Sequence, residues 1–227
     1  LEAPRGLMNM ITGGKVEAPE KILEDWGNPY RIFEIGIKSY PCCYHLQRII
    51  EATFELKRER GLRPEDIRNV DVEVNAFFPT VVQHPEPRTE IESQFSLPHA
   101  VGIAMIEDDV LPSGFSRKSI EDKRFRSFRP KVKTIVREDW GWAPTGWTPR
   151  ITYTLATGEV IVREPKAARG QPPELLGFDA CIPKYRGCVD GLLPPEHTQR
   201  SIEMLRNLRN LQDASTLVAE VAAIHNN

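Results

Sequence analysis

Two short segments of this 227-residue sequence hold the side chains best suited to chemistry. The first runs from Lys38 to His45 and reads KSYPCCYH, with a proline between an extended stretch and a helix. Backbone N–H groups at the start of a helix attract anions, and the ammonium of Lys38 adds to that attraction, so a carboxylate fits this corner. The same residues also fit a purely structural corner, in which Lys38 is solvated, His45 caps the helix and the cysteines fill the core.

The second segment, FSLPHA, places His99 in the first turn of a helix that is otherwise apolar. Histidine titrates near neutral pH, so His99 is a candidate for proton transfer or for contact with a substrate. The alternative is a buried histidine whose ring is hydrogen-bonded for structural reasons.

The common motifs for cofactors and metals are missing from the sequence. It has no Walker A loop and no GxGxxG, GxSxG or HExxH pattern, and none of its four cysteines forms a CxxC pair. A site built from Cys42, Cys43 and His45 would need a fourth metal ligand nearby. We therefore expect no metal and no organic cofactor, and we expect four free thiols.

Positive charge is concentrated between Arg117 and Arg137, where nine lysines and arginines stand against only Glu121 and Asp122. The whole chain has a formal net charge of -2, so the remainder is acidic. We interpret the basic stretch as a solvated face. The next alternative is an electropositive rim that attracts small polyanions. Nucleic acid is disfavoured, because no RNA-binding or helix-turn-helix pattern accompanies the charge.

Composition points to a globular protein, with 40% apolar and 27% charged residues. No apolar run approaches the ~20 residues that cross a bilayer, and the opening LEAPR is unlike a secretory signal. We expect a cytoplasmic protein without a membrane or nucleic-acid partner. The chain begins with Leu1 rather than Met, which indicates a processed product or a fragment.

The elements that must position these residues follow from hydrophobic periodicity. Alternation predicts a strand from Arg31 to Tyr40 and a clearer one from Ile67 to Phe77, whereas 3.6-residue periodicity predicts a helix from His45 to Arg60 that stops at Gly61. Phe95 to Ile106 reads as a buried helix capped by Ser96. The remaining expected elements are a short helix at Ala18–Trp26, a strand at Lys131–Arg137, a hairpin at Ile151–Val162, and helices at Pro173–Arg186 (interrupted at Pro183), Pro195–Leu211 and Asp213–Ile224.

This order predicts an α+β fold with an antiparallel or mixed sheet covered by helices and a helical C-terminal tail. We divide the chain into an irregular lead-in, residues 1–30, and one α+β domain, residues 31–227. That length is ample for a self-supporting core.

Four segments, in one consistent order, resemble the MmgE/PrpD family. They read KSYPCCYHLQRIIEA, RGLRPEDIRNVDVEV, PRTEIESQFSLPHAVGIAM and ATGEVIVREPKAARGQPP. The family includes 2-methylcitrate dehydratase, cis-aconitate decarboxylase and iminodisuccinate epimerase. The resemblance implies a helical N-terminal domain and a smaller α+β lid domain, of which this chain matches only the lid.

The resemblance also implies roles for individual residues. Lys38 matches a lysine on the substrate side of the lid. Cys43 falls where some members carry histidine, and His45 matches the later histidine of the variant that reads YPCC. His99 stands where tyrosine is usual, and Gln47 replaces a second histidine. Arg169-Gly170 matches a Lys-Gly pair that we expect to be structural. Members act on di- and tricarboxylates without metal or organic cofactor, by removing a proton next to a carboxylate.

We therefore expect the lid part of a lyase or isomerase for small polycarboxylates. Lys38 and Cys43 would contact the substrate, while His99 or His45 would orient or protonate it. The partner would be the helical domain that carries the base, so this chain alone should be inactive. We also expect a homo-oligomer, because the apolar helix Phe95–Ile106 and the tail helices should otherwise be exposed. The alternative is a non-catalytic interaction or regulatory module that keeps the lid fold.

Overall fold

The computed structural model describes residues 24, 27, 28, 30, 32, 35–143, 146–165, 167–171 and 175–222. The chain divides into two compact units, Leu1–Ile35 and Gly36–Asn227. The helix predicted for Ala18–Trp26 falls outside the described residues apart from Glu24, which lies in a turn. The fold that follows is that of the second unit.

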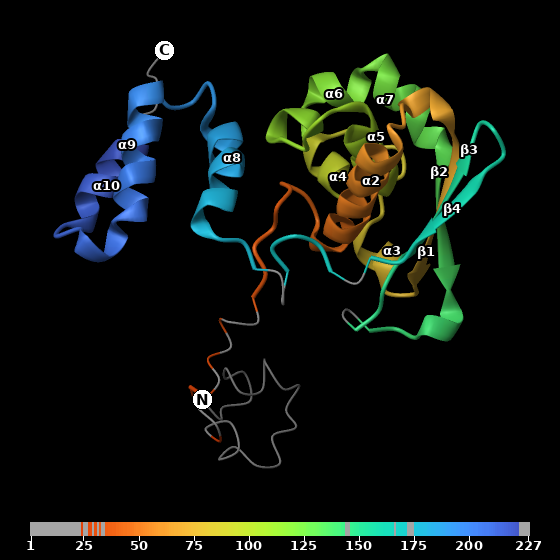
Figure 1. Ribbon diagram of the computed structural model, residues 1–227, viewed down its shortest axis with the longest axis horizontal. Coiled ribbons are helices and arrows are strands. Elements are labelled where there is room, and N and C mark those ends of the chain that lie inside the picture. The colour runs from red at the N-terminus through yellow and green to blue at the C-terminus, as the bar shows by residue number, and fades with distance from the viewer. Residues whose placement is uncertain are drawn as a thin grey trace. The chain divides into compact units, whose positions relative to one another are not determined.

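A mixed sheet of four strands, in the order β2-β1-β3-β4, lies to one side of the helices α2 (Gln47–Arg60) and α5 (Leu97–Ile106) (Figure 1). β1 pairs in parallel with β2 and antiparallel with β3, and β3 turns back into β4 as a hairpin. The strands are β1 (Ile67–Asn75), β2 (Val132–Arg137), β3 (Arg150–Leu155) and β4 (Val160–Arg163). Successive side chains of β1 point to opposite faces of the sheet, and Val70, Val72 and Val74, which share one face, have no exposed surface. The predicted α+β class with a mixed sheet is confirmed.

The helices α2 and α5 form the core together with the buried face of the sheet (Figure 1). Thr53 of α2 reaches the sheet, because its hydroxyl lies 2.9 Å from the phenol oxygen of Tyr153 in β3. As predicted, α2 ends at Gly61 in a left-handed conformation, and the side chain of Ser96 caps α5. Every residue of α5 from Leu97 to Met105 is buried. The helix therefore serves the core of this unit and leaves no apolar face for another subunit.

Short helices surround α5 and complete the core. They are α3 (Phe78–Val81), α4 (Glu90–Gln94), α6 (Arg117–Glu121) and α7 (Lys123–Phe128). The side chains of Ser116 and Asp122 cap α6 and α7, which explains why two helices this short begin where they do. Phe115, Phe125 and Phe128 are buried among these helices.

The tail is helical, as predicted, and contains α8 (Phe178–Val189), α9 (Pro195–Arg206) and α10 (Ala214–Val221). Asp213 caps α10 through its side chain. The predicted interruption at Pro183 is wrong, because α8 continues through this proline, although proline has no backbone N–H to donate within the helix. Within the part of the chain that the structure describes, no helix is long and apolar enough to cross a membrane.

The strand predicted from Arg31 to Tyr40 is wrong where the structure describes it. Gly36 to Tyr40 are not part of the sheet. Two isolated hydrogen bonds hold this segment instead: the Ile37 N–H donates to the Gly170 carbonyl at 2.7 Å, and the Ser39 hydroxyl donates to the Arg169 carbonyl at 2.6 Å. The segment also bonds to the side chains of Gln47 and Lys184 rather than to a neighbouring strand, so weak alternation produced no strand here.

Candidate functional site

The segment from Ser39 to Gln47 makes the tight corner that the sequence predicts. It bends through Cys42, enters the 3₁₀-helix η3 (Tyr44–Leu46) and continues as α2. Gln47 closes the corner: its side-chain oxygen accepts from the Tyr40 N–H at 2.9 Å, and its amide nitrogen donates to the Tyr40 carbonyl at 3.0 Å. Gln47 thus has a structural task in this corner.

The two adjacent thiols of the corner are buried. Cys43 occupies the N-cap position of η3, and burial raises the pKa of its thiol, although the backbone N–H of His45 and the ammonium of Lys38 oppose the rise. Burial raises the pKa of Cys42 to about 12, and the neighbouring Cys43 adds to that rise. Both groups are therefore neutral thiols near pH 7, unsuited to act as nucleophile or base.

Two lysines lie beside this corner. Lys38 is exposed, and its ammonium acts on the pKa of both thiols, which places the charge near the helix N-terminus. Lys184, from α8, donates a hydrogen bond to the main-chain carbonyl of Lys38 and also lowers the pKa of Cys42. The arrangement can attract a carboxylate through the positive charges of these two lysines.

His45 is half-buried in an aromatic setting rather than serving as a simple helix cap. Its ring is edge-on to Phe77, at 5.6 Å between centroids, and stacked with Trp147 at 6.2 Å. Burial lowers the pKa of His45, and the positive charge of Arg48 lowers it further. The imidazole is therefore neutral near pH 7 and can donate or accept a hydrogen bond without a change of charge.

His99 is completely buried, and its ring is engaged on both sides. Nε2 lies 2.9 Å from the carbonyl oxygen of Gly114, and Nδ1 lies 3.5 Å from a guanidinium nitrogen of Arg129. A carbonyl only accepts and a guanidinium only donates, so the proton must be on Nε2. Burial and the charge of Arg129 lower the pKa of His99 to about 4, against the opposing effect of Gly114.

The structure thus brings together three of the four predicted site residues. Lys38, Cys43 and His45 share one corner, and this corner also meets the end of α4, where the Cys43 N–H donates to the Gln94 carbonyl at 3.0 Å. The polar partners of the His99 ring, Gly114 and Arg129, do not belong to the corner. His99 lies in the core, where its ring connects α5 to the segments that follow it in the sequence.

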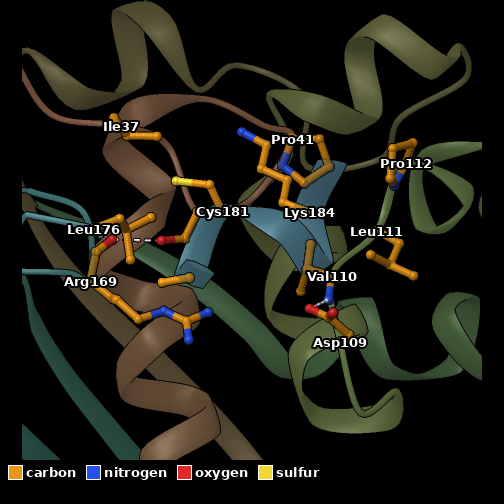
Figure 2. A pocket seen from close by; sticks show the side chains of 12 residues that line it. Ile37, Pro41, Asp109, Val110, Leu111, Pro112, Arg169, Leu176, Cys181 and Lys184 are labelled. Carbon is orange, nitrogen blue, oxygen red and sulfur yellow. Dashed lines mark hydrogen bonds between the residues drawn. The ribbon is translucent and has the colours of Figure 1, made fainter. Parts of the chain in front are cut away.

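A groove next to the corner brings together charged side chains from segments that lie far apart in the sequence. Two adjoining hollows share Asp109, Arg169 and Ala180 as lining residues, and the larger has a volume of about 490 Å³. Figure 2 shows the smaller hollow, where Arg169, Asp109 and Lys184 come from three separate segments. No local pattern could reveal this grouping, because it depends on where α8 lies against the loop after α5.

Four of the nine basic residues in the stretch from Arg117 to Arg137 form ion pairs with nearby acids. Arg124 pairs with Asp122 and Glu107, and Arg137 pairs with Glu73 and Asp139. Arg117 and Arg129 likewise have carboxylate partners, Glu121 and Glu86. Lys131 donates instead to main-chain carbonyls of Pro64 and Ile67. These pairs agree with the interpretation of the stretch as a solvated face.

Metal chemistry finds no support in the described side chains, which contain no group of three or more His, Cys, Asp or Glu residues placed to hold an ion. All four cysteines are free. The corner therefore offers binding by charge and hydrogen bonds.

Comparison with known proteins identifies the domain. Residues 40–210 match the MmgE/PrpD C-terminal domain. No curated protein matches the chain. The match spans most of the sequence and includes the corner, the sheet, the core helices and most of the tail. The chain therefore belongs to the MmgE/PrpD family, through that family's C-terminal domain.

Proposed function

We propose that this chain is the substrate-covering part of a cofactor-independent lyase or isomerase that acts on small di- or tricarboxylates. Residues 40–210 belong to the MmgE/PrpD C-terminal domain, and the family resemblance implies this reaction class. The observation that carries the proposal is the corner, where the positive charge of exposed Lys38 lowers the pKa of the thiols of Cys42 and Cys43, directly before the helix that starts at Tyr44.

The corner is suited to hold one carboxylate of a substrate. Lys38 supplies an exposed positive charge and Lys184 supplies a second one. Proton removal next to a carboxylate leaves negative charge on that carboxylate, and nearby cations stabilise this charge as it develops. Lys38 is thus the binding residue, and Cys43 lines the site as a neutral thiol.

His45 is the proposed hydrogen-bonding group of the reaction. It is half-buried, neutral and two residues from Cys43, so it can orient a substrate oxygen or deliver a proton to it. His99 is the proposed positioning residue, because its locked ring holds the start of α5 against Gly114 and Arg129. The general base would come from the helical domain of the family, which the matched residues do not include.

A non-catalytic interaction module is the second candidate. Two features favour it: the Cys43 thiol is neutral and buried, and the His99 ring is fully buried with both nitrogens occupied. Neither group can exchange protons with a substrate in this conformation. Such a module would still bind a carboxylate at Lys38 but would not increase any reaction rate.

Turnover assays test the proposal with cis-aconitate, 2-methylcitrate and iminodisuccinate as substrates. The chain alone should show no measurable turnover, because a missing general base typically costs 10²- to 10⁴-fold in rate. Each compound should nevertheless bind, and Lys38→Ala should weaken its binding. Clear turnover by the purified chain would show that the base lies in this chain. Failure of every compound to bind would refute the proposed substrate class.

A further inference from the structure

Arg48, in the first turn of α2, is a half-buried cation with neutral partners. Its Nε donates to the side-chain oxygen of Gln171 at 3.0 Å, and its Nη1 donates to the carbonyl oxygen of Trp147 at 2.9 Å. Among the residues that the structure describes, no carboxylate forms an ion pair with Arg48. The positive charge of this guanidinium is therefore not neutralised by these contacts.

Gln171 carries a buried donor that has no acceptor. Only 3% of the residue is exposed, and its Nε2 atom has no hydrogen-bond partner. The orientation of the amide is fixed, because Oε1 accepts from both the Arg48 Nε–H and the Ala168 N–H, the latter at 3.2 Å. A flipped amide would turn its NH₂ group toward two donors. The unpartnered atom is therefore the nitrogen, which can only donate.

The surroundings of this pair are well defined. The turn that contains Gln171 is held in place by the hydrogen bond from Ile37 to Gly170. Trp147, whose carbonyl anchors Arg48, stacks its ring on His45. A rigid cation and a fixed N–H donor thus lie side by side near the start of α2.

We propose that Arg48 and Gln171 form a binding site for a carboxylate group, which would accept from the Gln171 Nε2–H and lie against the Arg48 guanidinium. One cation and one amide donor suit a singly charged, planar group better than a phosphate dianion. The two groups of this site, the Arg48 guanidinium and the Gln171 amide, do not include Lys38. The claim that this site binds a carboxylate does not depend on the proposed function. Its use as a second subsite for the same polycarboxylate does rest on that function.

The side-chain amide of Gln171 gives a direct readout in ¹H–¹⁵N NMR spectra of the full chain. Acetate, as the smallest carboxylate probe, should shift the two Nε2 proton signals of Gln171 in a saturable way. The same shift should remain in Lys38→Ala, because the proposed site does not use the Lys38 ammonium. Signals that do not move at high acetate concentration, or that stop moving in Lys38→Ala, would overturn the proposal.

Gln171→Glu supplies a matched variant. A glutamate keeps the oxygen that accepts from Arg48 and Ala168, replaces the unpartnered donor with an acceptor, and pairs with the arginine charge. The variant should melt at a higher temperature than the original chain. It should bind acetate at this site at least tenfold more weakly, and the Arg48 Nε–H signal in the NMR spectrum reports that binding. A higher melting temperature with unchanged acetate affinity would mean that the unpartnered donor binds a water only, and would refute the site.

Arg48→Lys is the second variant, in case Gln171→Glu does not fold. Lysine keeps the charge but cannot donate simultaneously to Gln171 and to Trp147 in the same planar geometry. Acetate affinity at the Gln171 signals should fall at least severalfold. An unchanged affinity would contradict a role for the guanidinium.

Discussion

The Nε2 atom of His99 lies 2.9 Å from the carbonyl oxygen of Gly114, in a part of the core where the ring has no exposed surface. This bond fixes the proton on Nε2 and leaves Nδ1 facing Arg129. His99 therefore joins the start of α5 to two later segments of the chain. A residue that sequence similarity places at a substrate cleft is here a neutral part of the core.

Acid should destabilise the fold through His99. The pKa of His99 is lowered to about 4 in the folded chain, and the unfolded value is about 6.5. The unfolded state therefore takes up the proton first as the pH falls. The stability contribution of neutral His99 is complete above pH 6.5 and is lost progressively toward pH 4, by roughly 3 kcal/mol in total.

Urea unfolding at several pH values measures this loss. His99→Gln is the matched control, because its amide can still donate to Gly114 but does not titrate. The variant should be less stable at pH 7 and should lose less stability between pH 6.5 and pH 4. Parallel pH dependence in the two proteins would show that His99 is not the titrating group.

The cysteines should differ sharply in reactivity. Cys188 is exposed, whereas Cys42 and Cys43 are buried with raised pKa values. A thiol-specific reagent at pH 7.5 should modify Cys188 quickly and should leave Cys42 and Cys43 unmodified until the chain unfolds. Mass spectrometry of the native protein gives the order of modification. Rapid labelling of Cys43 would contradict its description as a neutral, covered thiol.

Two glycines with positive φ should respond differently to alanine. Gly158 has a φ of +92° and no atom within 4 Å of an added Cβ, so Gly158→Ala should cost only the conformational strain, about 1–2 kcal/mol. Gly170 has a φ of +87°, and its Cβ would lie 2.3 Å from the carbonyl oxygen of Ile37. Gly170→Ala should therefore cost roughly 3 kcal/mol or more, since the backbone must also move.

Denaturant midpoints of the two alanine variants test this comparison. Equal losses of stability would mean that the contact between the 168–171 turn and Ile37 does not constrain the chain. The turn also carries Arg169, so Gly170→Ala should disturb the groove while Gly158→Ala leaves it intact.

The tail helices predict self-association. Phe178, Leu192, Leu208 and Val218 are each at least 41% exposed on or next to these helices. Exposed apolar side chains form a contiguous patch on a surface that is covered in an assembly, and we expect these four to belong to such a surface. Light scattering should detect a dimer or a larger species at tens of micromolar. A clean monomer at that concentration would count against the prediction.

Elements with strong local signals could be predicted from the sequence. The alternation of β1 and the Ser96 cap of α5 are determined by residues within each element, so the structure matches them closely. The stretch from Gly36 to Tyr40 differs, because a strand also needs a free sheet edge beside it. The edge strands β2 and β4 do not pair with this segment, which is bonded to the 168–171 turn instead.

The candidate site was predictable only where it is local. Lys38, Cys43 and His45 are neighbours in the sequence, so their shared corner follows from the turn at Pro41. The surroundings of His99 depend on Gly114 and Arg129, which reach it only through the packing of later segments. Lys184 and Gln171 depend on contacts across more than 120 residues, and no spacing in the sequence reveals them.

Citrate titration by NMR is the most direct test of the central claim, that the corner at Lys38 binds a carboxylate. Exposed charges and a helix N-terminus contribute modestly, so the dissociation constant should be around millimolar. Shifts should cluster at Lys38, Cys43 and His45, and Lys38→Ala should remove them. Shifts confined to the basic stretch from Arg117 to Arg137, or shifts at the corner that survive Lys38→Ala, would contradict the claim.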